Sequence, residues 1–93
     1  MKYLRPDVIL KNVGETYMLV ALRSAWKDCP FITEISPLSA YFCECLSNKM
    51  PESQILESVR FKKPISPERL KRIYDKFIEF AEDKHYLVEG EGN

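Results

Sequence analysis

The chain of 93 residues has few of the residues from which catalytic and metal sites are usually built. It has three glycines, two of them among its last four residues, so no glycine-rich phosphate-binding loop is present. Its three cysteines and one histidine lack the CxxC spacing of a zinc site. The lone His85 follows a predicted helix, where it would favour the helix dipole. These absences argue against an enzyme and against a metal or other cofactor, and we expect none.

The sequence also has no excess charge and no long apolar run. Lys and Arg together number 14, as do Asp and Glu, so the formal net charge is zero. Binding to DNA or to an anionic membrane usually needs a basic excess, so neither is expected as the main partner. No apolar run approaches the roughly 20 residues of a membrane span. Pro6 and Asp7 stand where a signal peptide would be apolar, so we expect a cytoplasmic protein.

The three cysteines are consistent with a reducing compartment. Cys43 and Cys45 are two apart on a predicted helix and point in directions about 200° apart, so they cannot readily pair or share a metal. Cys45 lies on the apolar stripe of that helix and is expected in the core. Cys29 lies in a predicted loop and is expected to be the exposed thiol.

The first third of the chain has the pattern of a β-meander in a single domain. Residues 8–13 and 16–22 are rich in strand formers and are linked by Gly14-Glu15, which predicts a hairpin. Residues 23–30, RSAWKDCP, break the pattern and predict a loop. Trp26 in this loop is either folded back on its own domain, which is the commoner arrangement, or an anchor for a ligand.

A strand that runs straight into a helix follows the loop. Residues 31–35, FITEI, alternate as a half-buried strand and complete the meander. Ser36 is a natural N-cap, and Pro37 suits the first helical position. After it the apolar period changes to that of a helix. The apolar stripe of this helix consists of Leu38, Tyr41, Phe42, Cys45 and Leu46.

Two further helices are predicted. Residues 51–60 form a short one, residues 61–65 form a connection because Pro64 prevents a helix there, and Ser66-Pro67 starts a third that ends near residue 84. Residues 85–88 are expected to add a last extended turn and residues 89–93 to fray. The apolar positions of the third helix cover an arc of about 160°, wider than one neighbour usually needs. They are Leu70, Ile73, Tyr74, Phe77, Ile78, Phe80 and Ala81.

The predicted fold is α+β: a three-stranded antiparallel N-terminal sheet followed by three helices, β-β-β-α-α-α, in a winged helix-turn-helix-like arrangement. One function such a fold performs is DNA binding in transcriptional regulation, with the third helix in the major groove. Six basic residues near the start of that helix favour this function, namely Lys62, Lys63, Arg69, Lys71, Arg72 and Lys76. The neutral net charge opposes it, as do four acidic residues on the same helix, namely Asp75, Glu79, Glu82 and Asp83.

The other function is peptide binding by strand addition. If residues 31–35 form an edge strand, their free N–H and C=O groups can pair with an extended peptide. The third helix would form the other wall of a groove, in which Ile73 and Phe80 are flanked by Arg69 and Lys76. An apolar floor with a basic rim suits an acidic, amphipathic peptide. Alternatively, Ile73 and Phe80 belong to the core.

The order of elements and the junction ITEISPLSAYFCECL resemble the PqqD-like family, the recognition elements of ribosomally synthesised and post-translationally modified peptides (RiPPs). Ile35-Ser36 stands where the family usually has Leu-Asn. The opening LRPDVILKNVGETYMLVAL, the segment SQILESV and the closing HYLVE also resemble family elements, so the resemblance covers about residues 4–88. The chain departs from the family pattern at Ser47-Asn48-Lys49, where a glycine is usual, and at Trp26 and Cys29.

The resemblance implies a stand-alone protein that binds the leader segment of a precursor peptide and presents it to a modifying enzyme. That enzyme would be a radical SAM protein, a cyclase, a dehydratase or a leader peptidase, and the domain itself would need no cofactor. The leader would add an antiparallel strand beside the third strand and against the third helix. The implied peptide-binding residues are Phe31, Ile32, Thr33, Glu34 and Ile35 on the strand, and Arg69, Ile73, Lys76, Phe77 and Phe80 on the helix. The sequence leaves open whether the free protein forms a homodimer through its open edge.

Overall fold

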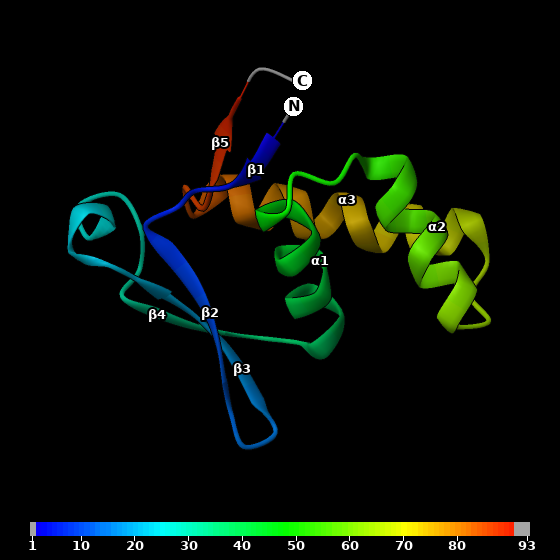
Figure 1. Cartoon of the computed structure of the whole chain (residues 1–93), viewed down its shortest axis with the longest axis horizontal. Helices are drawn as coiled ribbons and strands as arrows, with labels where there is room; N and C mark the ends of the chain where they lie inside the picture. The colour runs from blue at the N-terminus through cyan, green and yellow to red at the C-terminus, as the bar shows by residue number, and fades with distance from the viewer. Residues whose placement is uncertain (1, 91–93) are drawn as a thin grey trace.

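The computed structural model describes residues 2–90 of the chain, which form two small sheets and three helices (Figure 1). All three predicted helices and all three predicted strands are present, with small changes in their ends. The elements are β1 (Lys2–Leu4), β2 (Val8–Val13), β3 (Thr16–Ala21), a 3-10 turn η1 (Arg23–Ala25), β4 (Ile32–Ile35), α1 (Pro37–Ser47), α2 (Glu52–Lys62), α3 (Pro67–Asp83) and β5 (Leu87–Glu89).

The predicted meander is confirmed. Strands β2, β3 and β4 lie side by side in that order and are antiparallel, so β2 and β4 are the two edges of the sheet. Val13 faces Thr16 across a two-residue turn, as the hairpin prediction required. Gly14 has a φ of +66° there, a left-handed conformation that glycine adopts without steric cost.

A second sheet, which the sequence did not predict, joins the two ends of the described chain. Strands β1 and β5 pair antiparallel, with Lys2 opposite Glu89 and Leu4 opposite Leu87. The predicted order β-β-β-α-α-α is therefore incomplete, because one strand precedes the meander and another follows α3. Strands of three residues are too short to show a hydrophobic period. Residues 89–93 were expected to fray, but Glu89 belongs to β5 and pairs with Lys2. Residues 91–93 lie outside the described part of the chain.

Helices α1 and α3 begin where their capping residues predict. Ser36 Oγ accepts a hydrogen bond from the backbone N–H of Ser39, and Ser66 Oγ accepts one from Arg69. Helix α2 is longer than predicted, since Phe61 and Lys62 are helical rather than part of a connection. Pro64 disfavours the helical conformation only at the residue before it, and Lys63 is indeed extended.

One core lies between the helices and the sheets. Phe42 of α1 is fully buried; its ring meets Tyr74 edge-on with centroids 5.1 Å apart and lies 5.5 Å from that of Phe77. Tyr86, between α3 and β5, is also fully buried, and its ring lies 6.2 Å from that of Phe80. Its hydroxyl is hydrogen-bonded to the side chain of Thr33. Tyr86 therefore links the end of α3 to strand β4. None of the helices in residues 2–90 combines the length and the apolar character needed to cross a bilayer.

Candidate functional site

The backbone N–H and C=O groups of successive β4 residues point alternately toward β3 and toward the open edge of the sheet. The N–H of Ala21 donates to the carbonyl of Phe31 over 2.9 Å, and the pairs Leu19–Thr33 and Tyr17–Ile35 follow in the same register. Hydrogen-bonded pairs alternate along an antiparallel ladder, so Thr33 and Ile35 bond to β3. The N–H and C=O groups of Ile32 and Glu34 consequently point away from β3, toward the open edge.

The side chains of β4 alternate as well. Thr33 and Ile35 are half-buried, and Thr33 reaches Tyr86 in the core. Ile32 and Glu34 are exposed, and Ile32 keeps 60% of its surface accessible. A slip of one residue would exchange these two faces, so the burial pattern fixes the register of β4.

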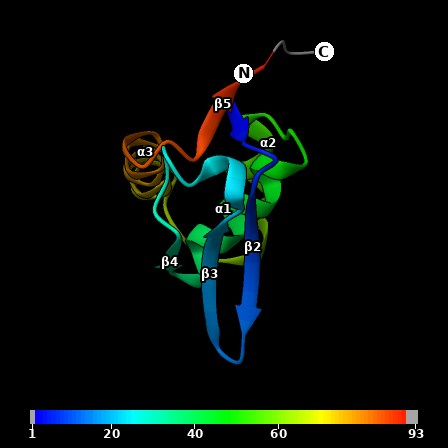
Figure 2. The ribbon, with the colours of Figure 1, turned by 90° about the vertical axis from the view of Figure 1, so that its left-hand side faces the viewer.

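Helix α3 lies on the same side of the molecule as β4, and β2 lies on the opposite side of the meander (Figure 2). Phe80 is half-buried, and its ring packs on Tyr86, which bonds to Thr33. This chain of contacts joins the C-terminal half of α3 to the middle of β4.

The other predicted residues of α3 occupy different environments. Ile73 is half-buried at the margin of the core, two turns before Phe80. Phe77 is only 6% exposed and belongs to the core. Arg69 and Lys76 are exposed. Arg69 lies eleven residues before Phe80, about 16 Å along the helix axis, and therefore near the far end of α3.

Tyr86 is the one residue of this region that the sequence analysis did not single out. It was included in an extended turn after the third helix. The only signal for it was an aromatic residue in the run YLV, and that run is too short to show which face is buried.

Trp26 and Phe31 lie just beyond the N-terminal end of β4. The indole N–H of Trp26 donates to the carbonyl of Ala21 over 2.9 Å, and the ring lies 5.1 Å from that of Phe31. Trp26 is nevertheless 46% exposed and Phe31 is 62% exposed. Trp26 is thus tied to its own domain by a hydrogen bond, while nearly half of its surface stays accessible to solvent, so both of the arrangements considered for it remain open.

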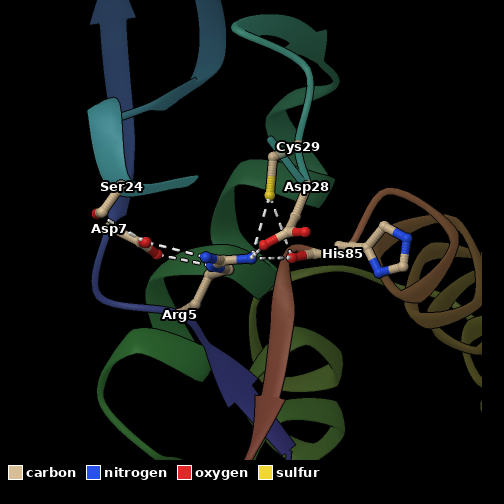
Figure 3. A network of polar contacts seen from close by, with 6 residues as sticks. All are labelled: Arg5, Asp7, Ser24, Asp28, Cys29 and His85. Carbon is tan, nitrogen blue, oxygen red and sulfur yellow. Dashed lines mark hydrogen bonds and ion pairs between the residues drawn. The ribbon is translucent and has the colours of Figure 1, made fainter. Parts of the chain in front are cut away.

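A polar network centred on Arg5 fixes the loop that carries Trp26 (Figure 3). The guanidinium of Arg5 binds both carboxylate oxygens of Asp7, at 2.6 and 2.9 Å, and donates to the carbonyl of His85 over 3.2 Å. The Cys29 thiol donates to the same carbonyl over 3.2 Å. The hydrogen bond from Arg5 lowers the pKa of Asp7 to about 2. This network connects the N-terminal segment, the loop and the end of α3, so its evident role is structural.

The expectation that Cys29 is exposed is wrong. It is 5% exposed, because the loop folds over the end of α3 and places the thiol against the His85 carbonyl. Burial raises the pKa of Cys29, and it raises that of Cys43 to about 12, so neither is an activated nucleophile. Within the part of the chain that the structure describes, no three His, Cys, Asp or Glu side chains are placed to hold a metal.

Two of the six basic residues near the start of α3 are already engaged within the domain. Lys71 forms ion pairs with Glu52 at 3.0 Å and with Asp75 at 2.8 Å. The ammonium group of Lys62 lies 4.9 Å from the centre of the Tyr41 ring. A helix that reads DNA needs free cations facing the phosphates, so this arrangement does not favour the DNA-binding hypothesis.

Comparison with protein-family models gives no match, and comparison with curated proteins gives none. Among solved structures, the fold is similar to that of TbiB1 in complex with the TbiA(beta) leader peptide. The TM-score is 0.75 at 12% identity, and the match covers 98% of this chain and 99% of TbiB1. The two proteins therefore share a fold over almost their whole lengths. The resemblance found in the sequence is therefore matched by a shared fold with a protein that was solved with a leader peptide.

Proposed function

We propose that this protein binds the leader segment of a precursor peptide by strand addition to β4 and presents the peptide to a modifying enzyme of RiPP biosynthesis. The observation that carries the proposal is the open edge of β4, which lies beside a half-buried apolar part of α3. The fold in which this edge occurs is also that of TbiB1, a protein solved with a leader peptide.

Backbone pairing would set the direction and register of the leader. Its residues would exchange hydrogen bonds with Ile32 and Glu34, whose backbone groups face the open edge. The leader residue opposite Thr33 would point to the same face as Thr33, toward Phe80 and the end of α3. An apolar side chain fully buried there would contribute roughly 1.5–3 kcal/mol, so this position would carry most of the discrimination.

The charged groups of α3 would contribute less. Arg69 and Lys76 are exposed, so their attraction for an acidic leader is screened by salt. Lys76 lies one turn before Phe80 and would act near the bound strand, while Arg69 would act at the far end of the helix. We therefore expect added salt to weaken leader binding modestly.

The enzyme that receives the leader would be a radical SAM protein, a cyclase, a dehydratase or a leader peptidase. The protein would contribute affinity and placement, and the chemistry would belong to this partner. The thiols of this chain are buried and have raised pKa values, which fits a binding role. Binding to DNA is the weaker candidate because the chain has no net positive charge and Lys71 is already paired with two carboxylates.

A proline substitution on β4 tests the proposal. Glu34→Pro removes an N–H that faces the open edge and leaves the ladder with β3 intact, a position where sheets tolerate proline. Asn12→Pro is the matched control on the β2 edge, since the two-residue hairpin turns the backbone groups of Asn12 outward. Circular dichroism would establish that both variants are folded.

The readout is capture from a lysate of the source organism with a tagged chain, followed by mass spectrometry. We expect the wild type and Asn12→Pro to recover a short precursor peptide, and Glu34→Pro to lose it. A folded Glu34→Pro variant that retains the precursor would exclude strand addition to β4. Recovery of DNA fragments without any peptide would support the regulator hypothesis instead.

A further inference from the structure

Two large aromatic side chains are exposed together just before β4 begins. Phe31 is 62% exposed and Trp26 is 46% exposed. The rings of Trp26 and Phe31 lie 5.1 Å apart and are tilted by 47°. We refer to these two residues as the aromatic step. Ile32, the first residue of β4, is also 60% exposed, on the other face of the strand. An exposed apolar cluster that adjoins an unpaired strand edge is typical of a binding surface.

The aromatic step is held rigidly. The indole N–H of Trp26 is bonded to the carbonyl of Ala21, and Ala25 beside it is fully buried. The thiol of Cys29, three residues after Trp26, is bonded to the carbonyl of His85. The surface is therefore formed before any partner arrives, so binding would not have to order it.

Charged side chains of opposite sign lie toward the two ends of the β4 edge. The guanidinium of Arg23 lies 5.7 Å from the centre of the Trp26 ring, and Lys27 is exposed next to it in the chain. Asp28 lies 3.7 Å from Arg5, but the charge of Arg5 is already matched by Asp7. Within residues 23–30, Asp28 is therefore the one carboxylate set against the two cations Arg23 and Lys27, which leaves the aromatic step with a net positive charge. Near the other end of β4, Glu34 is exposed and makes that part of the edge acidic.

From this geometry we infer, resting on the proposed strand addition, that the aromatic step selects peptides with a large apolar or aromatic residue followed by an acidic one. A peptide added antiparallel to β4 runs in the opposite direction, so its residue paired with Glu34 comes two positions before its residue paired with Ile32. The one or two peptide residues after the one paired with Ile32 pass Phe31 and Trp26. The large apolar residue is the one that lies there, and the acidic residue after it meets Arg23 and Lys27. A basic residue is favoured two positions before the one paired with Ile32, opposite Glu34.

The charges also distinguish this peptide from a second copy of the chain. β4 has only four residues, and a symmetric pairing centred on Glu34 would place two carboxylates opposite each other. A symmetric pairing centred on Thr33 would place Glu34 opposite Ile32, so neither register gives Glu34 a cationic partner. The segment that would pair in such a dimer has no acidic residue directly after its exposed aromatic residue, because Phe31, just before β4, is followed by Ile32 and Thr33. A peptide of the stated chemistry satisfies both ends of the edge, whereas β4 itself does not.

The test uses a displayed library of random twelve-residue peptides, selected for binding to the wild-type protein. Enriched peptides should share a large apolar residue followed by Asp or Glu. Trp26 is the only tryptophan of the chain, so its fluorescence reports directly on this surface. Adding an enriched synthetic peptide should shift its emission to shorter wavelength and reduce its quenching by acrylamide, with no such change in Ile32→Pro.

Variants then separate the aromatic step from the strand edge. Trp26→Ala and Phe31→Ala should each weaken binding of the enriched peptide about tenfold or more, as expected for aromatic residues at the centre of an interface. Replacing the large apolar residue of the peptide by Ala should weaken its binding to the wild-type protein by a similar factor. The same replacement should change its binding to Trp26→Ala only a little. Phe61→Ala is the matched control, because Phe61 is 94% exposed on α2, at the opposite end of the molecule from β4 (Figure 1), and should leave affinity unchanged.

Two results would overturn the inference and leave the proposed function in place. The first is a set of peptides that no longer bind the Ile32→Pro variant but bind the Trp26→Ala and Phe31→Ala variants as tightly as the wild-type protein. The second is the absence of any preferred large apolar residue among peptides that require the β4 edge. If no peptide is enriched, or if sedimentation shows a dimer that Ile32→Pro dissociates, strand addition of a foreign peptide is itself wrong and the inference is overturned with it.

Discussion

Arg5 has the densest set of polar contacts among the described residues, although it lies in a segment that resembles an ordinary chain end. Its guanidinium binds Asp7 through two nitrogen atoms and also reaches the carbonyl of His85. Ser24 Oγ donates to the same carboxylate of Asp7. A planar guanidinium can satisfy several acceptors at once, which a lysine could not do with the same geometry. Arg5 therefore helps to hold the loop with Trp26 against the end of α3, together with the hydrogen bonds of Trp26 and Cys29.

Replacing Asp7 by Asn tests the network through its pH dependence. The folded pKa of Asp7 is about 2, below its ordinary value of 3.8, so its ionised form stabilises the fold above about pH 4. That stabilisation is lost as the pH falls toward 2. Asp7→Asn should therefore lower the free energy of unfolding by about 1–2 kcal/mol at pH 7 and by much less at pH 2.5.

Urea unfolding at the two pH values would measure this difference. Ser24→Ala is the control, because it removes one hydrogen bond to Asp7 and keeps the ion pair with Arg5, so its effect at pH 7 should be smaller. An equal loss of stability in Asp7→Asn at pH 7 and at pH 2.5 would contradict the role given to the carboxylate.

At the scale of elements, the sequence predicts starts of helices better than ends. Ser36-Pro37 and Ser66-Pro67 place the first residues of α1 and α3 correctly because a cap acts on the adjacent turn. The end of α2 was placed two residues early, since Pro64 was taken to exclude helix at Phe61 and Lys62. The exposed side chain of Phe61 gives no periodic signal that could have corrected this.

The two serine caps supply a quantitative prediction. Ser36→Ala and Ser66→Ala each remove the side-chain acceptor for an N–H in the first turn, so each should destabilise the fold by about 1 kcal/mol. Thermal unfolding followed by circular dichroism would measure the loss. Ser47→Ala, an exposed position at the last residue of α1, should cost much less. The explanation would be wrong if Ser47→Ala were as damaging as the cap variants.

At the scale of the whole molecule, local patterns predicted the elements but not their long-range contacts. The β1–β5 sheet pairs residues from the two ends of the chain, and neither three-residue segment shows a period. The burial of Cys29 likewise depends on Arg5 and His85, which are distant in sequence. The open edge of β4 could be predicted, because a meander leaves its third strand at an edge. The rigid placement of Trp26 could not, since it depends on the carbonyl of Ala21 across the turn.

Tyr86 is where these long-range contacts meet, so its removal should affect the whole molecule. Its side chain is fully buried, and it contacts both Phe80 and Thr33. Tyr86→Ala should cost about 3–5 kcal/mol, a large share of the 5–15 kcal/mol typical of a small domain. Tyr86→Phe loses only the hydrogen bond to Thr33 and should cost about 1 kcal/mol.

Urea unfolding of both variants would give these values, and hydrogen exchange would show whether protection of β4 falls in Tyr86→Phe. Phe61 lies in helix α2, but its side chain is 94% exposed, so Phe61→Ala should change the free energy of unfolding by less than about 0.5 kcal/mol. Equal losses in Phe61→Ala and Tyr86→Ala would show that burial does not decide the effect.

The β1–β5 sheet has a consequence for how the chain can be rearranged. Lys2 and Glu89 are cross-strand partners, and such pairs lie about 5 Å apart between their Cα atoms. A few added residues would therefore close the backbone into a ring, and the ring could be reopened at the tip of the Gly14-Glu15 turn to give a circular permutant. Because both joined ends lie away from β4 (Figure 1), the same geometry would let the domain be inserted into a surface loop of another protein with the β4 edge still accessible.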